Sequence, residues 1–432
     1  MLRAPALAAA ILGSTAALAA DEAPFELHAQ ATYARQYKPG FAANYSGPNS
    51  LRSTPETSYT FTATLYAGLR LGEDSELYFN PEFVQGNPLS GLHGLGGFTN
   101  GEAQRGAGPE LRGYRARLFL RHTWNLNGAV EEEPSGQNQL RARYAAKRVV
   151  VTAGNFSVLD VFDALDYSHD PRTQFMNWSS LTYGAWDFPA DARGYTWGVA
   201  LEYLAPGWQA RAGRFLVPRE SNGLALDREF ASRYGDVAEI ALPYGVAGRP
   251  AVARALLFRN RVHAGGFEDA LSAAAGGGPP DVAHVRRDQS KTGLGVGTQI
   301  ELGAGLGAFA RAGWNDGKTE TFMFTEIDRS LAAGITAKGG RWARPEDSAG
   351  VAAYANGLSQ PHRAYLGAGG LGFFLGDRQL RYASERILEG YYSLNVAGGA
   401  WLSLDLQRIA NPGYNRDRGP ASVLGFRLHG EF

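Results

Sequence analysis

A two-residue alternation of apolar and polar side chains, repeated along the chain, constrains the fold more than any other feature. Between Thr60 and Leu71 the odd positions are Phe, Ala or Leu, and the even positions are Thr, Tyr, Gly or Arg. This period places successive side chains on opposite faces of a β-strand. Such a segment can cross a bilayer, which takes about 9 to 11 residues of tilted strand. The same alternation recurs in Tyr114–Arg121, Tyr195–Tyr203, Thr292–Leu302 and Trp401–Gln407.

The C-terminal segment Ala421–Phe432 shows the same period. Leu424, Phe426, Leu428 and Phe432 share one parity, and Gly, Arg, His and Glu occupy the other. A last strand that ends on Phe, in a chain that starts with an export signal, is typical of outer-membrane barrels, where it pairs with the first strand and leaves no edge. We therefore expect an all-β fold, a transmembrane antiparallel up-and-down β-barrel closed by residues 421–432.

The first twenty residues have the features of a secretory signal peptide. One early Arg precedes a short apolar run and an A-x-A motif, which predicts cleavage after Ala19 or Ala20. No later apolar run reaches the ~18 residues of a membrane-spanning helix. The chain has no cysteine, which excludes a disulfide framework. We expect a signal peptide (1–20), a polar segment with one short first strand (21–56), and one barrel domain (57–432).

Length fixes the number of strands only loosely. At ~10 residues per strand plus a turn or loop, the chain accommodates sixteen strands, with eighteen as the alternative. A secreted antiparallel sandwich would also alternate and is the alternative interpretation of each strand. Polar faces that combine Arg, Glu, Gln and Gly, and apolar faces that end on Tyr, Trp or Phe, favour a membrane barrel with aromatic girdles.

Five inserts lack the alternation and predict long external loops, which often carry function. They are Gln85–Leu111, Ser157–Arg193, Leu216–Arg249, Ala264–Asp288 and Thr325–His362. The second insert is rich in Asp and aromatic residues. We hypothesise that it folds into the lumen and narrows the pore; the alternative is an external cap. Its candidate constriction residues are Asp163, Asp166, Asp170, Trp178 and Trp186.

Arginine recurs on the parity that faces away from lipid. On the lipid side an arginine costs about 2 to 4 kcal/mol near the midplane, a penalty that is absent in a wet lumen. The guanidinium fork can donate to sugar hydroxyls, although a cationic lining would also favour anions. In the alternative interpretation, the arginines only pair with inward carboxylates and stiffen the wall. The candidate lining residues are Arg70, Glu82, Arg115, Arg117, Arg121, Arg141, Arg143, Glu202, Arg211 and Arg427.

Motifs for catalysis and cofactor binding give no positive signal. Gly367–Gly372 matches the dinucleotide pattern G-x-G-x-x-G, but an apolar run follows it where the motif requires a helix. No H-E-x-x-H or G-x-S-x-G sequence occurs. Lys and Arg together equal Asp and Glu at 42 each, so net charge does not indicate a nucleic-acid partner. We expect no enzyme activity, no metal and no cofactor.

Several stretches resemble the carbohydrate-selective porins of the OprB type, and they follow one another through nearly the whole chain after the signal. The resemblance implies a monomeric or trimeric outer-membrane barrel of sixteen strands through which glucose and related sugars diffuse into the periplasm. The stretches are Gln30–Phe41, Tyr45–Leu51, Glu76–Glu102, Ala153–Asp163, Asp170–Ser179, Arg193–Glu202 and Asn411–Phe432.

The leading interpretation is a passive diffusion channel for mono- and oligosaccharides in the bacterial outer membrane. Its expected partners are the transported sugars, outer-membrane lipid and lipopolysaccharide, the barrel-assembly machinery through the C-terminal strand, and two further copies if the chain is trimeric. The alternatives are an anion or organic-acid channel, a polysaccharide-export conduit with eighteen strands, and an outer-membrane hydrolase or adhesin.

Overall fold

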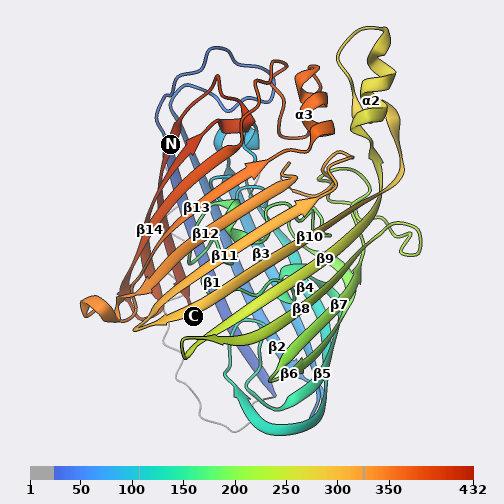
Figure 1. The fold of residues 1–432 in the computed structure, drawn as a ribbon. Helices are drawn as coiled ribbons and strands as arrows, with labels where there is room; N and C mark the ends of the chain where they lie inside the picture. The colour runs from blue at the N-terminus through green and yellow to red at the C-terminus, as the bar shows by residue number, and fades with distance from the viewer. Residues whose placement is uncertain (1–23, 107, 325) are drawn as a thin grey trace.

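The computed structural model of the protein describes residues 24–106, 108–324 and 326–432, and within them the chain forms one closed barrel of sixteen antiparallel strands (Figure 1). The strands are β1 (Phe25–Lys38), β2 (Glu56–Arg70), β3 (Ser75–Asn87), β4 (Gly108–Glu133), β5 (Ala142–Phe156), β6 (Thr196–Ala205), β7 (Trp208–Phe215), β8 (Tyr234–Val246), β9 (Arg249–Gly265), β10 (Arg286–Gly303), β11 (Leu306–Asn315), β12 (Arg329–Lys338), β13 (Ser348–Gly357), β14 (Glu385–Ala397), β15 (Ala400–Ala410) and β16 (Ala421–Glu431).

Each strand pairs with its neighbours in sequence, and the first pairs with the last. Tyr33 of β1 lies opposite Leu428 of β16 on one side and Phe61 of β2 on the other. This closure confirms the predicted up-and-down topology and sixteen rather than eighteen strands. The prediction that the barrel starts at residue 57 is wrong, because β1 is a full barrel strand. The predicted signal peptide lies outside the described residues.

The alternation seen in the sequence separates the two faces of the wall. In β2, Thr60, Thr62, Thr64, Tyr66 and Gly68 are buried, whereas Leu65 and Leu69 are exposed on the outer surface. In β16 the outward residues are again the apolar ones, and Arg427 points inward. An apolar outer band with a polar interior is the pattern of membrane barrels.

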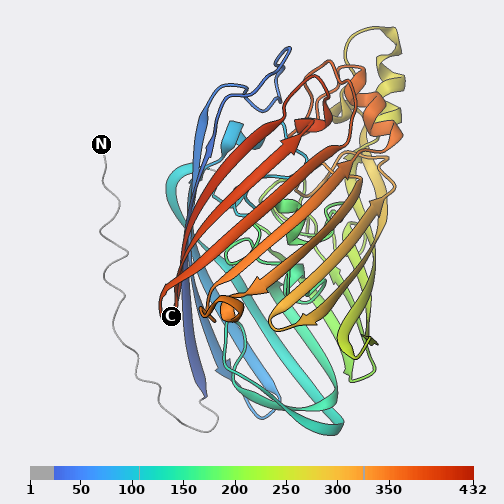
Figure 2. The same cartoon turned by 60° about the vertical axis from the view of Figure 1, so that its left-hand side comes forward.

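Short turns and long loops alternate between successive strands and therefore gather at opposite ends of the barrel (Figure 2). Two-residue turns join β6 to β7 and β8 to β9, whereas 39 residues, 157–195, lie between Phe156 of β5 and Thr196 of β6. Two of the predicted inserts are not single loops: Leu216–Arg249 contains β8, and Thr325–His362 contains β12 and β13.

The helices are short and lie in the loops. They are α1 (Trp178–Leu181), α2 (Phe267–Ala273) and α3 (Gln360–Gly367), with 3-10 turns η2 (Leu89–Leu92), η3 (Val158–Asp160), η4 (Ala274–Gly276), η5 (Val282–Val285), η6 (Gly339–Trp342) and η7 (Pro412–Tyr414). Helices α2 and α3 stand at the long-loop end (Figure 1). Within the described residues, none of the helices has the length and apolar character needed to cross a bilayer.

The segment between β5 and β6, residues 157–195, is the inner loop: it folds inside the barrel, where both views show it in green (Figures 1 and 2). Inward glycines on the strands make room for its rings. A Cβ at Gly295 would lie 2.5 Å from Cγ of Tyr183, and one at Gly307 would lie 2.2 Å from Cζ of Tyr167. The abundance of glycine thus serves close packing between the wall and the inner loop.

Candidate functional site

The inner loop begins in a turn that sets one carboxylate against the barrel wall. Ser157 and Asp160 form a capping box, in which Ser157 N donates to Asp160 Oδ2 at 3.0 Å. The same carboxylate accepts two hydrogen bonds from Arg117 of β4, at 2.7 Å from Nε and 2.6 Å from Nη2. This bidentate geometry is the strong form of the pair. Arg117, a predicted lining residue, therefore faces the lumen and contacts the loop there.

A chain of alternating charges runs along the inner face of β6 to β9. Arg211 Nε donates to Glu202 at 2.8 Å, and Glu239 accepts from Arg211 at 3.3 Å and from Arg254 at 3.2 Å. Glu239 also accepts from the backbone N–H of Asp163 at 2.7 Å, which ties this chain to the inner loop. Sequence reasoning found Glu202 and Arg211. It missed Glu239 and Arg254, although the inward parity of β8 and β9 carries that signal.

Two further ion pairs fix the inner loop to the opposite strands. Asp163 lies 3.1 Å from Arg311 of β11, and both side chains are almost fully buried. Lys291 of β10 donates to Asp187 at 3.0 Å. Buried charges persist only when they are paired and hydrogen-bonded. Asp163, a predicted constriction residue, is thus an anchor of the loop rather than a group presented to the pore.

Glu82 of β3 lies at the centre of another buried cluster. Its carboxylate accepts from Thr64 Oγ1 at 2.6 Å, from Arg172 at 2.9 Å and from Tyr195 Oη at 3.2 Å, and Tyr114 Oη also donates to it. The side chain of Glu82 has no exposed surface. Although it points inward as predicted, it holds the loop and offers no surface to a solute.

The closing strands hold the middle of the loop through its backbone. Arg427 of β16 donates to the carbonyls of Pro171 at 2.8 Å and Gln174 at 2.7 Å. Arg427 itself is only 1% exposed. Glu389 of β14 accepts from Met176 N at 2.6 Å and from the next amide at 2.9 Å. Arg427 therefore faces inward, as predicted, and is covered by the loop that it binds.

Some predicted site residues of the inner loop and of the strands near the short turns keep part of their surface exposed. Asp160 and Asp166 are exposed, and Asp170 is half-buried. Gln299 of β10 donates to Asp166 at 2.6 Å. Arg121 of β4 donates to the carbonyl of Asn138 at 3.1 Å.

Arg70 reaches the same end of the barrel from β2. Its Nη2 donates to the carbonyl of Arg141 at 2.6 Å, and its Nη1 lies 3.7 Å from Glu76. This end of the interior thus places partly exposed guanidinium groups beside carboxylates.

The tryptophans of the inner loop do not face the arginines. Trp178 and Trp186 are both buried, and Trp178 packs against Phe324 with ring centroids 4.9 Å apart. Trp186 lies 5.6 Å from Phe188, centroid to centroid. Each such ring contributes on the order of 1.5 to 3 kcal/mol of burial. These residues form an apolar core inside the barrel, which corrects their assignment as pore-facing rings.

Arg115 lies on the outer face, contrary to the parity assigned from the sequence. A bulge at Pro81 shifts the register, so that Asn80 lies opposite Arg117 while Pro81 lies opposite Arg115. Proline has no N–H for the ladder and is confined to bulges and edges. The guanidinium of Arg115 consequently sits 5.1 Å from the ring centroid of Trp197, which is exposed on the outer wall.

Arg141 and Arg143 also differ from the prediction. Tyr144 points inward and donates to Glu76 at 3.0 Å, which fixes the parity of β5 and turns Arg143 outward. Arg143 is exposed and lies 3.7 Å from Glu132 in the hairpin that extends beyond the barrel. Arg141 precedes β5 and is exposed. The aromatic residue, rather than the arginine, occupies the interior here.

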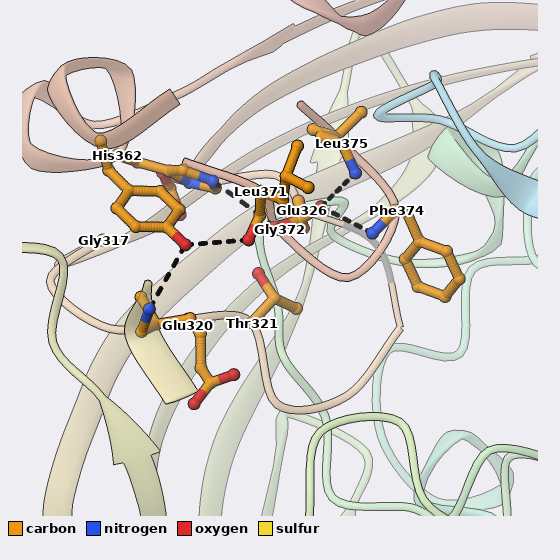
Figure 3. A network of polar contacts seen from close by, with 12 residues as sticks. Gly317, Glu320, Thr321, Glu326, His362, Leu371, Gly372, Phe374 and Leu375 are labelled. Carbon is orange, nitrogen blue, oxygen red and sulfur yellow. Dashed lines mark hydrogen bonds and ion pairs between the residues drawn. The ribbon is translucent and has the colours of Figure 1, made fainter. Parts of the chain in front are cut away.

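At the long-loop end, α3 and the loop between β11 and β12 form a buried polar network (Figure 3). His362 Nδ1 lies 2.9 Å from Asp328 Oδ2, and its Nε2 lies 3.6 Å from Glu326. Burial by itself lowers the pKa of His362, but these carboxylates outweigh burial and raise it to about 9. The ring stacks on Phe267 of α2 with centroids 4.2 Å apart. The network joins the β9–β10, β11–β12 and β13–β14 loops into one unit, the loop cap.

The glycine-rich segment after α3 explains the G-x-G-x-x-G match. The backbone N–H groups of Phe374 and Leu375 donate to Glu326 Oε2 at 3.0 and 2.8 Å (Figure 3). A Cβ at Gly372 would lie 1.8 Å from Glu326 Oε1, so the close approach requires glycine. The segment binds an anion as such loops do, but the anion is a side chain of the same protein.

Metal-ligand chemistry has no candidate cluster: in the described ranges, no group of three or more His, Asp or Glu side chains is arranged to hold an ion. The site consists of the partly exposed arginine and carboxylate groups, the inner loop that lies inside the barrel, and the loop cap. Such an arrangement can bind polar solutes weakly through hydrogen bonds.

Comparison with known proteins relates the chain to porins by family and by barrel fold. The model of the carbohydrate-selective porins, OprB family, matches residues 48–432. OprB of Pseudomonas putida, in its high-pH structure, is 16% identical with a TM-score of 0.68 over 95% of this chain and 94% of that one. The outer membrane channel DcaP of Acinetobacter baumannii is 12% identical with a TM-score of 0.51 over 94% and 97%. At such identities the structural matches show the fold. No curated protein is a significant match. Because the family match covers most of the sequence, this chain belongs to the OprB family of carbohydrate-selective porins, β-barrels of the outer membrane.

Proposed function

We propose that the protein is a passive channel through which neutral sugars diffuse into the periplasm, past Arg117, Arg121, Asp160 and Asp166. The observation that carries the proposal is the pairing of an inward-facing guanidinium with a carboxylate of the inner loop, as in Arg117 and Asp160, both of which keep some exposed surface. A sugar hydroxyl is both donor and acceptor, so it can bond both members of such a pair. Binding is expected to be weak, because a conducted solute must leave as readily as it enters.

An anion or organic-acid channel is the second candidate, and local charge balance argues against it. Glu202 and Glu239 neutralise Arg211 and Arg254, and Asp160 neutralises Arg117. Selectivity for anions arises from rings of uncompensated positive charge. The paired lining therefore favours neutral solutes. The polysaccharide-export alternative assumes a barrel of eighteen strands, whereas this barrel has sixteen.

We extend the proposal to the remaining partners. We propose that the barrel sits among outer-membrane lipid and lipopolysaccharide, is inserted by the barrel-assembly machinery through its C-terminal strand, and works as a monomer or a trimer. Insertion through the C-terminal strand is supported by the outer face of that strand, which carries Leu424, Phe426 and Leu428.

Liposome swelling tests the solute class. Vesicles that contain the purified protein are diluted into iso-osmotic glucose or into a monocarboxylate of equal size, and the swelling rates are compared. We expect faster swelling in glucose. Faster entry of the carboxylate would reject the sugar assignment in favour of the anion channel, and no swelling in either would reject both.

A further inference from the structure

The outer wall of the barrel carries an apolar groove beneath the loop cap. A hollow of about 910 Å³ spans β10 to β15 and is lined by Ala310, Ala333 and Ala353, with Leu331 and Leu388 at its sides. A second hollow of about 360 Å³ shares Leu331 with it and continues toward the long-loop end. The two form one elongated depression in the lipid-facing surface.

The register of the sheet explains the depression. Ala310 lies opposite Ala333, and Ala333 lies opposite Ala353, so one row of methyl groups crosses three neighbouring strands on the outer face. The rows on either side carry longer residues, Leu331 and Ile335 on β12. A void in a lipid-facing wall loses dispersion contacts unless a flexible chain fills it. The shape therefore suits an acyl chain.

Arginines mark the end of the groove nearest the long loops. Arg386, the second residue of β14, and Arg408, near the end of β15, line the larger hollow; Arg329 and Arg363 line the smaller one. In the described part of the chain, none of the four forms a salt bridge. Arg408 donates only to Ser422 Oγ at 2.7 Å. An uncompensated arginine is tolerated on a lipid-facing wall near the interface.

We propose that this groove binds a phosphorylated glycolipid of the outer leaflet, lipid A, with acyl chains along the alanine row and a phosphate on Arg386 and Arg408. The long loops of such barrels face the cell exterior, which places the arginines at the level of outer-leaflet headgroups. The planar guanidinium matches phosphate through two parallel hydrogen bonds. A second copy of the chain is the competing occupant, but it would have to bring acidic groups to a cationic rim.

The test measures lipid A binding to the full-length mature protein in detergent by native mass spectrometry. The variant R386A/R408A removes the phosphate contacts, and A333W/A353W fills the groove. We expect both to weaken lipid A binding at least about tenfold, and lipid A without phosphates to bind the wild type as weakly as it binds R386A/R408A. Arg143→Ala is the matched control, since Arg143 is also exposed outside the barrel but lies at the short-turn end.

Unchanged lipid A binding in R386A/R408A would overturn the proposal, as would equal binding of lipid A with and without phosphates. If the variants instead lower the oligomer size while lipid A binding stays the same, the occupant is a second copy and the lipid assignment is wrong. Glucose swelling is measured on the same samples. It should remain at the wild-type rate, because these residues lie outside the lumen, so failure of the lipid proposal and failure of the sugar channel are distinguishable.

Discussion

Arg172 of the inner loop and Glu82 of β3 form an ion pair with 2.9 Å between Nη2 and Oε2, in which both side chains are buried. Arg172 Nε also donates to Glu102 at 2.9 Å. The guanidinium therefore lies between two carboxylates that have almost no contact with solvent. This relationship anchors the middle of the inner loop to the wall.

Replacing Arg172 with Met should destabilise the protein by at most about 3 to 5 kcal/mol, because Glu82 and Glu102 lose their closest cation and keep only Arg105, at 3.9 and 3.5 Å. The loop should also detach from the wall and single-channel conductance should rise. Thermal unfolding in detergent and planar-bilayer recording measure the two effects. The control is Arg112→Met, whose pair with Glu110 is exposed and should matter little. Equal conductance in R172M and wild type would show that the loop stays in place without this pair.

Arg117 and Arg115 provide an internal comparison for solute binding. They are two residues apart on β4, but the bulge turns Arg117 to the lumen and Arg115 to the outer wall. Arg117→Ala should weaken the block of ion current by sugars several-fold, because it removes donors from the lumen. Arg115→Ala should leave the block unchanged. The measurement is sugar titration of the current through single channels. Equal loss in both variants would contradict the placement of Arg115.

The sequence predicted the strands whose outer face carries long apolar residues. In β2 and β16 the contrast between Leu or Phe outside and Thr, Gly or Arg inside is strong, so the period is visible. In β13 the outward residues Ala353 and Ala355 are as small as inward Ala352, and the period is faint. Strand β13 therefore lies inside a predicted loop, Thr325–His362.

The parts of the site that sequence reasoning missed depend on long-range pairing. Arg172 and Glu82 are 90 residues apart, and no local pattern links them. The bulge at Pro81 reverses parity within β4, and strict alternation cannot reveal a one-residue shift. Strict alternation therefore predicts the wrong face for Arg115, before the bulge, and the inner face that the structure shows for Arg117 and Arg121, after it.

The loop cap should loosen at alkaline pH. The pKa of His362 is raised to about 9 from a usual value near 6.5, so its stabilising contribution is complete below pH ~6.5 and lost as pH rises through ~9. The shift corresponds to about 3 kcal/mol at most. Burial raises the pKa of Asp328, but His362 outweighs burial and lowers it, so that contribution is lost only in acid.

Hydrogen exchange of residues 358–384 measures this effect. Protection in the wild type should fall between pH 7 and 10 once the intrinsic exchange rate is corrected. His362→Gln should show less protection at pH 7 and little further change, because Gln carries no charge to lose. A fall of the same size in H362Q would assign the pH dependence to another group.

Gly372→Ala tests the cradle around Glu326 by adding one methyl group. The added Cβ would lie 1.8 Å from Glu326 Oε1, so either the carboxylate or the segment 370–376 must move. The hydrogen bonds that the backbone N–H groups of Phe374 and Leu375 donate to Glu326 are then lost. Overpacking of this kind costs about 1 to 3 kcal/mol. Limited proteolysis should cut this segment faster in G372A. Gly367→Ala is the matched control, since a Cβ there meets nothing within 4 Å. If both variants are cleaved at the wild-type rate, the contact between Gly372 and Glu326 does not hold the loop cap together.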